Sequence, residues 1–172
     1  MERQFEIHLG KLRTRIIKMS SLVEDQMELA IRAINEENLE LTNLIIERED
    51  KINKLDRKIE RTCQKIIALS QPVAIDLRLV LSALTINTNL ERLGDLAKNI
   101  ARSFQTLKKK PIFLNSTKFH DMTIIVRKMI KDAIDSFNNN DAALAKKVIE
   151  ADVNLDNLFA ENRKILINIM KE

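Results

Sequence analysis

The sequence has 172 residues, 45% of them hydrophobic and 31% charged, and its 29 Lys and Arg against 25 Asp and Glu give a net charge of +4. This apolar fraction suffices for a core and excludes wholesale disorder, while two Gly and two Pro are too few for a turn-rich sheet protein. The single Cys63 excludes an intramolecular disulfide and a zinc site built from several cysteines.

The sequence shows no leader with a cleavage site at its N-terminus. No uncharged run approaches the ~20 residues that a membrane-spanning helix needs. We therefore expect a cytoplasmic protein without membrane insertion. The charge balance is mild and the chain contains no Tyr or Trp for stacking on bases, so we expect no nucleic-acid partner.

Apolar residues recur at steps of three and four, which predicts helices throughout the chain. The first helix covers residues 5–34, and a turn at 35–38 places Asn38 as the cap of a second helix from about 39 to 69. A break at 70–72 precedes a third helix that ends near residue 108. Pro72 is expected in the first turn of that helix, with Asp76 one turn later.

Residues 111–116 are the one predicted linker. A fourth helix is expected from about 117 to 137, followed by a turn at 138–140. Asp141 then caps a fifth helix that runs to the end of the sequence.

A shift of the sequence by 103 positions without a gap aligns apolar, turn and acidic positions in one register. The aligned pairs include Met19 with Met122, Asn35 with Asn138, Leu41 with Leu144, Glu49 with Asp152 and Asn53 with Asp156. The repeat predicts an all-α protein of tandem antiparallel three-helix bundles, residues 1–110 and 111–172, the second without its third helix.

The register places that missing helix near position 175, so either the chain has been cut or the protein lacks this helix. In both cases, the fourth and fifth helices leave apolar faces that need burial. The first unit, another copy of the chain or the missing segment could cover them.

Acidic and amide side chains repeat every four residues on the third predicted helix. Glu91, Asp95 and Asn99 stack on one face, and oxygen ligands of this kind suit Mg, Mn or Fe. The second helix offers Glu49 with Asn53, and the fifth offers Asp152 with Asp156. Carboxylates on facing helices of a bundle can converge on a metal. An alternative is a solvated acidic face in which Asp95 pairs with Lys98.

Two motifs on the third helix carry a family resemblance. The runs are Gln71-Pro72-Val73-Ala74-Ile75-Asp76-Leu77-Arg78 and Leu90-Glu91-Arg92-Leu93-Gly94-Asp95 with Asn99-Ile100. They are similar to the pattern of the PhoU family, bacterial regulators of phosphate uptake and of the phosphate-starvation response. The resemblance covers the whole chain, is specific in the third helix, and implies two three-helix bundles.

The resemblance also implies metal clusters (Fe, Mn, Zn or Mg) built from acidic pairs of the second and third helices. These map onto Glu49 with Asn53, Glu91 with Asp95, and Asp152 with Asp156. Asn53 departs from the pattern because it is neutral, and a second E-R-x-G-D run is absent from the sequence, so we expect the second cluster to be incomplete.

The function implied by the resemblance is that of a non-enzymatic regulator. It would hold down phosphate uptake and phosphate-regulon signalling by binding a phosphate ABC transporter ATPase and a sensor histidine kinase, as a homodimer. Asp76, Arg78, Arg92 and Asn99 are candidates for partner contacts or for positioning. The alternatives are a metal-dependent phosphoester hydrolase and a ligand-free helical oligomerisation module.

Overall fold

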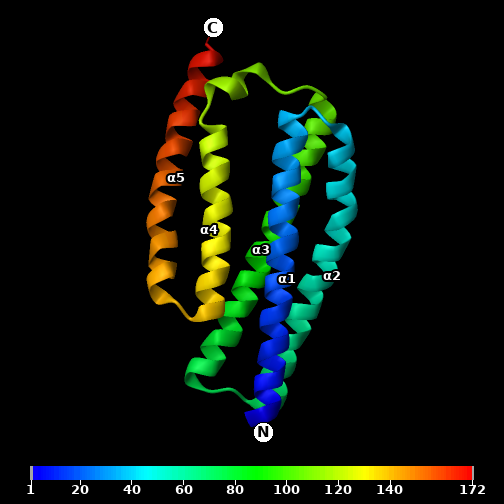
Figure 1. The fold of residues 1–172 in the computed structure, drawn as a ribbon, viewed down its shortest axis with the longest axis vertical. Helices are drawn as coiled ribbons and strands as arrows, with labels where there is room; N and C mark the ends of the chain where they lie inside the picture. Colours follow the sequence, from blue (N-terminus) through cyan, green and yellow to red (C-terminus); the bar gives the residue numbers. More distant parts are fainter. Residues whose placement is uncertain (1, 172) are drawn as a thin grey trace. The chain divides into compact units, whose positions relative to one another are not determined.

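The computed structural model describes residues 2–171, with side-chain surroundings from residue 4 to residue 171. Over this range the chain forms five α-helices and one short 3-10 helix (Figure 1). The α-helices are α1 (Glu2–Asn35), α2 (Leu39–Ser70), α3 (Ala74–Leu107), α4 (Phe119–Asn139) and α5 (Ala142–Ile169), and the 3-10 helix is η1 (Ile112–Ser116). The predicted all-α class, with a three-helix bundle followed by a helix pair, is confirmed.

The chain divides into two compact units, residues 1–106 and residues 107–172. The first unit contains α1, α2 and nearly all of α3, and the second contains η1, α4 and α5. Within the first unit, α1 and α2 run antiparallel and pack along each other, as α4 and α5 do within the second (Figure 1). None of the described helices is long and apolar enough to span a membrane.

The core of the first unit is built from helix faces with regular apolar spacing. On α2, the fully buried isoleucines lie seven residues apart at positions 45, 52, 59 and 66. The buried apolar residues of α1 include Leu12, Ile16, Met19 and Val23. Those of α3 range in size from alanine to phenylalanine: Val80, Ala83, Leu90, Ala97, Ala101 and Phe104.

The two predicted N-caps form as the sequence indicates. The Asn38 side chain accepts a hydrogen bond from the backbone N of Glu40 at 2.9 Å, and the Asp141 side chain accepts one from Leu144 N at 2.9 Å. Each cap satisfies a backbone N–H group that the first helical turn leaves unpaired. The capped helices begin at Leu39 and Ala142, which are 103 positions apart, so the repeat seen in the sequence recurs in the helix boundaries.

One expectation at the helix junctions was wrong, and one connection is more ordered than expected. Pro72 does not lie in the first turn of α3, because Gln71 adopts a left-handed backbone with φ 44° and α3 begins only at Ala74. Residues 112–116, expected as a linker, form η1, in which Leu114 N donates to Pro111 O at 3.0 Å. Short 3-10 turns are common connectors, and the sequence carries little signal for them.

The second unit encloses much less apolar surface than the first. Among its described residues only Ile134 and Asn162 are buried, while Ile124, Ile149, Val153 and Phe159 are more than half exposed. The sequence predicted such open apolar faces on the fourth and fifth helices. The Asn162 side chain connects α5 to the start of α4, since its Oδ1 accepts from Lys118 N at 2.6 Å and its Nδ2 contacts Met122 Sδ at 2.9 Å.

Gly94 lies on α3 where side chains of α2 pack against its backbone. A Cβ atom at this position would be 3.0 Å from Ile52 Cδ1 and 3.7 Å from Glu49 Oε2. Glycine costs about 1 kcal/mol relative to alanine inside a helix, so the close approach of Ile52 gives the reason for its presence.

We predict that the effect of Gly94→Ala depends on Ile52. The added methyl group gains helix propensity but presses on Cδ1, whereas Ile52→Val removes that atom. In a double-mutant cycle measured by urea unfolding, Gly94→Ala should be more favourable by about 0.5–1.5 kcal/mol in the Ile52→Val background than in the wild type. Additive free energies of unfolding would show that this contact does not select glycine.

The buried thiol of Cys63 is predicted to be inert in the native protein. Burial raises its pKa to about 11, which leaves little of the reactive thiolate at neutral pH. At pH 8 an aromatic disulfide reagent should label native protein roughly 100-fold or more slowly than protein unfolded in guanidinium. Rapid labelling of the folded protein at one thiol per chain would contradict this expectation.

Candidate functional site

The carboxylate of Glu49 is the centre of a polar cluster that joins all three helices of the first unit. Glu49 lies on α2, and only 5% of its surface is exposed to solvent. From α1, Gln26 Nε2 donates to Glu49 Oε2 at 3.2 Å and to the carbonyl of Ile45 at 3.2 Å. From α3, Lys98 Nζ lies 3.6 Å from Glu49 Oε1. The buried charge is therefore held between an amide and an ammonium group from two neighbouring helices.

The same ammonium group serves a second carboxylate on its own helix. Lys98 Nζ donates a hydrogen bond to Asp95 Oδ1, and the two residues form an i, i+3 ion pair. This hydrogen bond holds the pKa of Asp95 below its ordinary value and raises the pKa of Lys98. The alternative that Asp95 pairs with Lys98 is thus confirmed.

Glu91 lies one turn before Asp95 and is only partly exposed. Its pKa is raised, first because burial disfavours the charged form and then because the carboxylates of Asp95, Asp56 and Glu49 lie nearby. Four carboxylates and one ammonium group therefore make up this part of the interface between α2 and α3. We call Glu49, Asp56, Glu91, Asp95 and Lys98 the carboxylate cluster.

Further side-chain bonds tie α2 to α3 on both sides of this cluster. Asn87 Nδ2 donates to Asp56 Oδ1 at 2.6 Å and to the carbonyl of Asp56 at 3.3 Å. Near the other end, Gln105 Nε2 donates to Thr42 Oγ1 and to Asn43 Oδ1, both at 2.9 Å. The helix pair is therefore fixed in register by hydrogen bonds as well as by apolar packing.

The structure brings together only some of the residues that the sequence marked as candidate ligands. Glu49, Glu91 and Asp95 share the carboxylate cluster. Asn53 is half-buried and forms no hydrogen bond with a described residue. Asp152 and Asp156 lie exposed on α5 and make no ion pair within the described part of the chain. The exposed candidates for partner contacts all lie on α3: Asp76, Arg78, Arg92 and Asn99.

As placed, the carboxylate cluster does not fit a metal ion. Within the described residues no group of three or more His, Cys, Asp or Glu side chains lies close enough to hold one. Lys98 supplies a positive charge between Glu49 and Asp95, where the sequence predicted a metal. A metal would need the ammonium group to leave, so the metal sites stay a prediction.

Sequence reasoning missed Gln26 and the pair formed by Asn87 and Asp56 as parts of this site, and it did not predict the contact of Lys98 with Glu49. Gln26 interrupts the apolar face of α1 and is fully buried. A glutamine at an otherwise apolar helical position could have indicated a polar contact in the core, because buried side-chain amides are normally hydrogen-bonded. Which partner it meets depends on the register between helices, which spacing along one helix does not contain.

Together the geometry defines a repeat-built helical-bundle protein whose first unit is joined by a polar cluster at the interface between α2 and α3. A family model described as PhoU domain matches residues 16–104 and 119–172, well over half of the chain. The chain belongs to the PhoU family, as the motifs of α3 indicated.

Known relatives agree with this assignment in sequence and in fold. The chain is 37% identical over 164 residues to a phosphate-specific transport system accessory protein PhoU homolog of Aquifex aeolicus, covering 95% of this chain and 74% of the relative. The crystal structure of PhoU from Pseudomonas aeruginosa matches with a TM-score of 0.87 and 30% identity, over 97% of this chain and 80% of that one. A phosphate transport system regulatory protein PhoU from Streptococcus pneumoniae matches with a TM-score of 0.86, 28% identity and coverage of 97% and 79%.

We predict that Lys98 competes with divalent cations for the carboxylate cluster. Lys98→Met removes the ammonium group, so Glu49 and Asp95 become available to a cation. Calorimetric titration with Mn²⁺ at pH 7 should give about tenfold or more tighter binding to Lys98→Met than to the wild type. The triple variant Glu91→Ala, Asp95→Ala and Lys98→Met should lose this gain.

Lys128→Met, which removes an exposed lysine of α4, serves as the matched control and should bind Mn²⁺ as the wild type does. Circular dichroism checks that each variant remains helical, because Lys98→Met leaves the buried Glu49 without its ammonium partner. Equal Mn²⁺ affinity of Lys98→Met and the wild type would contradict the competition.

Proposed function

We propose that the protein is a non-enzymatic cytoplasmic regulator that restrains phosphate uptake and phosphate-regulon signalling by binding a phosphate ABC transporter ATPase and a sensor histidine kinase. The observation that carries the proposal is its similarity, over nearly its whole length, to proteins named phosphate-specific transport system accessory proteins. A regulator that acts by contact needs an exposed surface held in a fixed orientation.

The outward face of α3 is our candidate for that surface. Arg92, Leu96 and Asn99 follow each other at steps of four and three, so they lie on one side of the helix. All three are exposed, and Leu96 is 56% exposed. An apolar side chain between a guanidinium and an amide is typical of a protein-binding surface. We call Arg92, Leu96 and Asn99 the α3 contact face.

The carboxylate cluster supports this proposal from the neighbouring side of α3, about 100° around the helix from the contact face. Asp95 and Lys98 alternate along the helix with the residues of the contact face, and Lys98 pairs with the buried Glu49. The ion pairs therefore restrict rotation and sliding of α3 relative to α2. A partner would meet the contact face in a single orientation. Less conformational entropy would then be lost when the complex forms.

We predict that the α3 contact face binds the transporter ATPase. Arg92→Glu combined with Leu96→Ala should weaken binding of the purified ATPase about tenfold or more, because it reverses a charge and truncates an apolar contact at the centre of the face. Biolayer interferometry with the purified protein measures the affinity, and circular dichroism checks the helical content.

The matched control is Lys128→Glu combined with Ile124→Ala, which changes one exposed charge and one exposed apolar residue on α4. Its affinity for the ATPase should stay within about twofold of the wild type. If wild-type protein does not bind the ATPase, the proposed function fails. If the contact-face variant binds as tightly as the control, the surface assignment fails.

A further inference from the structure

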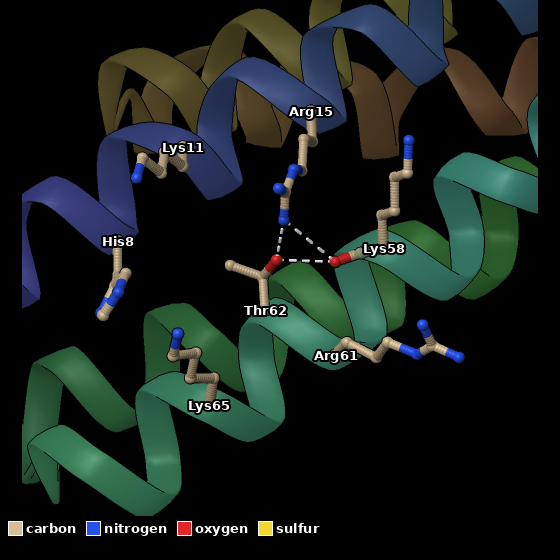
Figure 2. Close-up of a pocket in the computed structure, with 7 residues that line it drawn as sticks. All are labelled: His8, Lys11, Arg15, Lys58, Arg61, Thr62 and Lys65. Atoms are coloured by element: carbon tan, nitrogen blue, oxygen red, sulfur yellow. Dashed lines mark hydrogen bonds between the residues drawn. The ribbon is translucent and has the colours of Figure 1, made fainter.

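A basic pocket lies between α1 and α2, apart from the carboxylate cluster. Its volume is about 280 Å³ (Figure 2). Helix α1 contributes His8, Lys11 and Arg15, and α2 contributes residues from Lys58 to Lys65. On each helix the lining residues are three or four positions apart, so they form one stripe, and the antiparallel helices place the two stripes face to face.

Five of the seven lining residues are lysine or arginine, and none is acidic. These cations are Lys11, Arg15, Lys58, Arg61 and Lys65. None of the five forms an ion pair with a residue whose side chain the structure describes. No carboxylate among the lining residues compensates these cations, and a bound anion would supply that compensation.

Arg15 is held in place at one end of the basic pocket. Its Nη1 donates to the hydroxyl of Thr62 and to the carbonyl of Lys58, the latter at 3.2 Å (Figure 2). Thr62 is buried and its hydroxyl is fixed by a bond to the same carbonyl at 2.6 Å. Arg15 Nε and Nη2 donate no hydrogen bond to a described residue, so both groups can donate to a ligand. The guanidinium is therefore oriented before a ligand arrives.

His8 adds an unsatisfied polar atom at the other end. Its Nδ1 is buried from solvent and has no hydrogen-bond partner among the described residues. Lys11, Lys58, Arg61 and Lys65 are exposed, so the pocket is open to solvent. A ligand could reach these four exposed cations without any movement of the helices.

We propose that the basic pocket binds an anion with at least two linked phosphoryl groups, such as inorganic tripolyphosphate or the phosphate chain of a nucleotide. Arginine and lysine in combination are the usual partners of phosphoryl oxygens. A single phosphate would leave most of the five positive charges uncompensated. No Phe lines the pocket and the chain has no Tyr or Trp, so His8 is the one aromatic ring among the lining residues, while the five cations suit a phosphate chain. The proposal for the basic pocket does not rest on the proposed regulatory function.

Calorimetry at constant ionic strength, without divalent cations, tests the proposal with tripolyphosphate, ATP, orthophosphate and sulfate. Tripolyphosphate should bind at one site per chain, about tenfold or more tighter than orthophosphate or sulfate. ATP that binds as tightly as tripolyphosphate supports recognition of the phosphate chain alone. Tighter binding of ATP supports the site and identifies a nucleotide as its ligand.

Lys58→Gln combined with Lys65→Gln should weaken tripolyphosphate binding about tenfold or more, because both residues are exposed and line the pocket from α2. Lys146→Gln combined with Lys147→Gln removes the same charge from exposed positions of α5 and should leave the affinity within about twofold. Thermal unfolding checks that both proteins are folded. Equal weakening in both variants, equal binding of sulfate and tripolyphosphate, or no binding would overturn the proposal.

Discussion

The buried carboxylate of Glu49 is the constraint on which the arrangement of the first unit depends. Taking a carboxylate out of water costs several kcal/mol unless it is paired and hydrogen-bonded. Here the partners are Gln26 from α1 and Lys98 from α3. Sliding either helix by one turn would withdraw its partner, whereas the apolar contacts of the core would tolerate such a shift more easily. A polar interaction therefore specifies the register that hydrophobic burial stabilises.

The helix α2 takes part in two sites of opposite charge. The carboxylate cluster draws Glu49 and Asp56 from the middle of the helix, while Lys58, Arg61 and Lys65 line the basic pocket nearer its C-terminus. One helix thus supports two chemically opposite sites with different neighbours, α3 for the acidic one and α1 for the basic one.

The sequence predicted the helices and both N-caps because these depend on local spacing and on residues near one another in the chain. It also identified Glu49, Glu91 and Asp95 as a candidate cluster, since residues four apart share a helix face. It did not predict that Gln26 would meet Glu49, or that Lys11 and Arg15 would face Lys58 and Lys65. Those pairings depend on how one helix is placed along another. The sequence also did not predict the left-handed backbone at Gln71, because residues other than glycine and asparagine rarely adopt that conformation.

The unequal burial of the two units has a consequence for how the chain opens. Amide hydrogens of α1, α2 and α3 are protected by a continuous core, so they exchange with solvent only through extensive unfolding. The helix pair α4 and α5 has Ile134 as its one buried apolar side chain among the described residues, and its hydrogen bonds break in smaller and less costly openings. The difference in burial therefore predicts two cooperative units of different stability, with the helix pair α4 and α5 as the first part to open to isotope exchange and proteolysis.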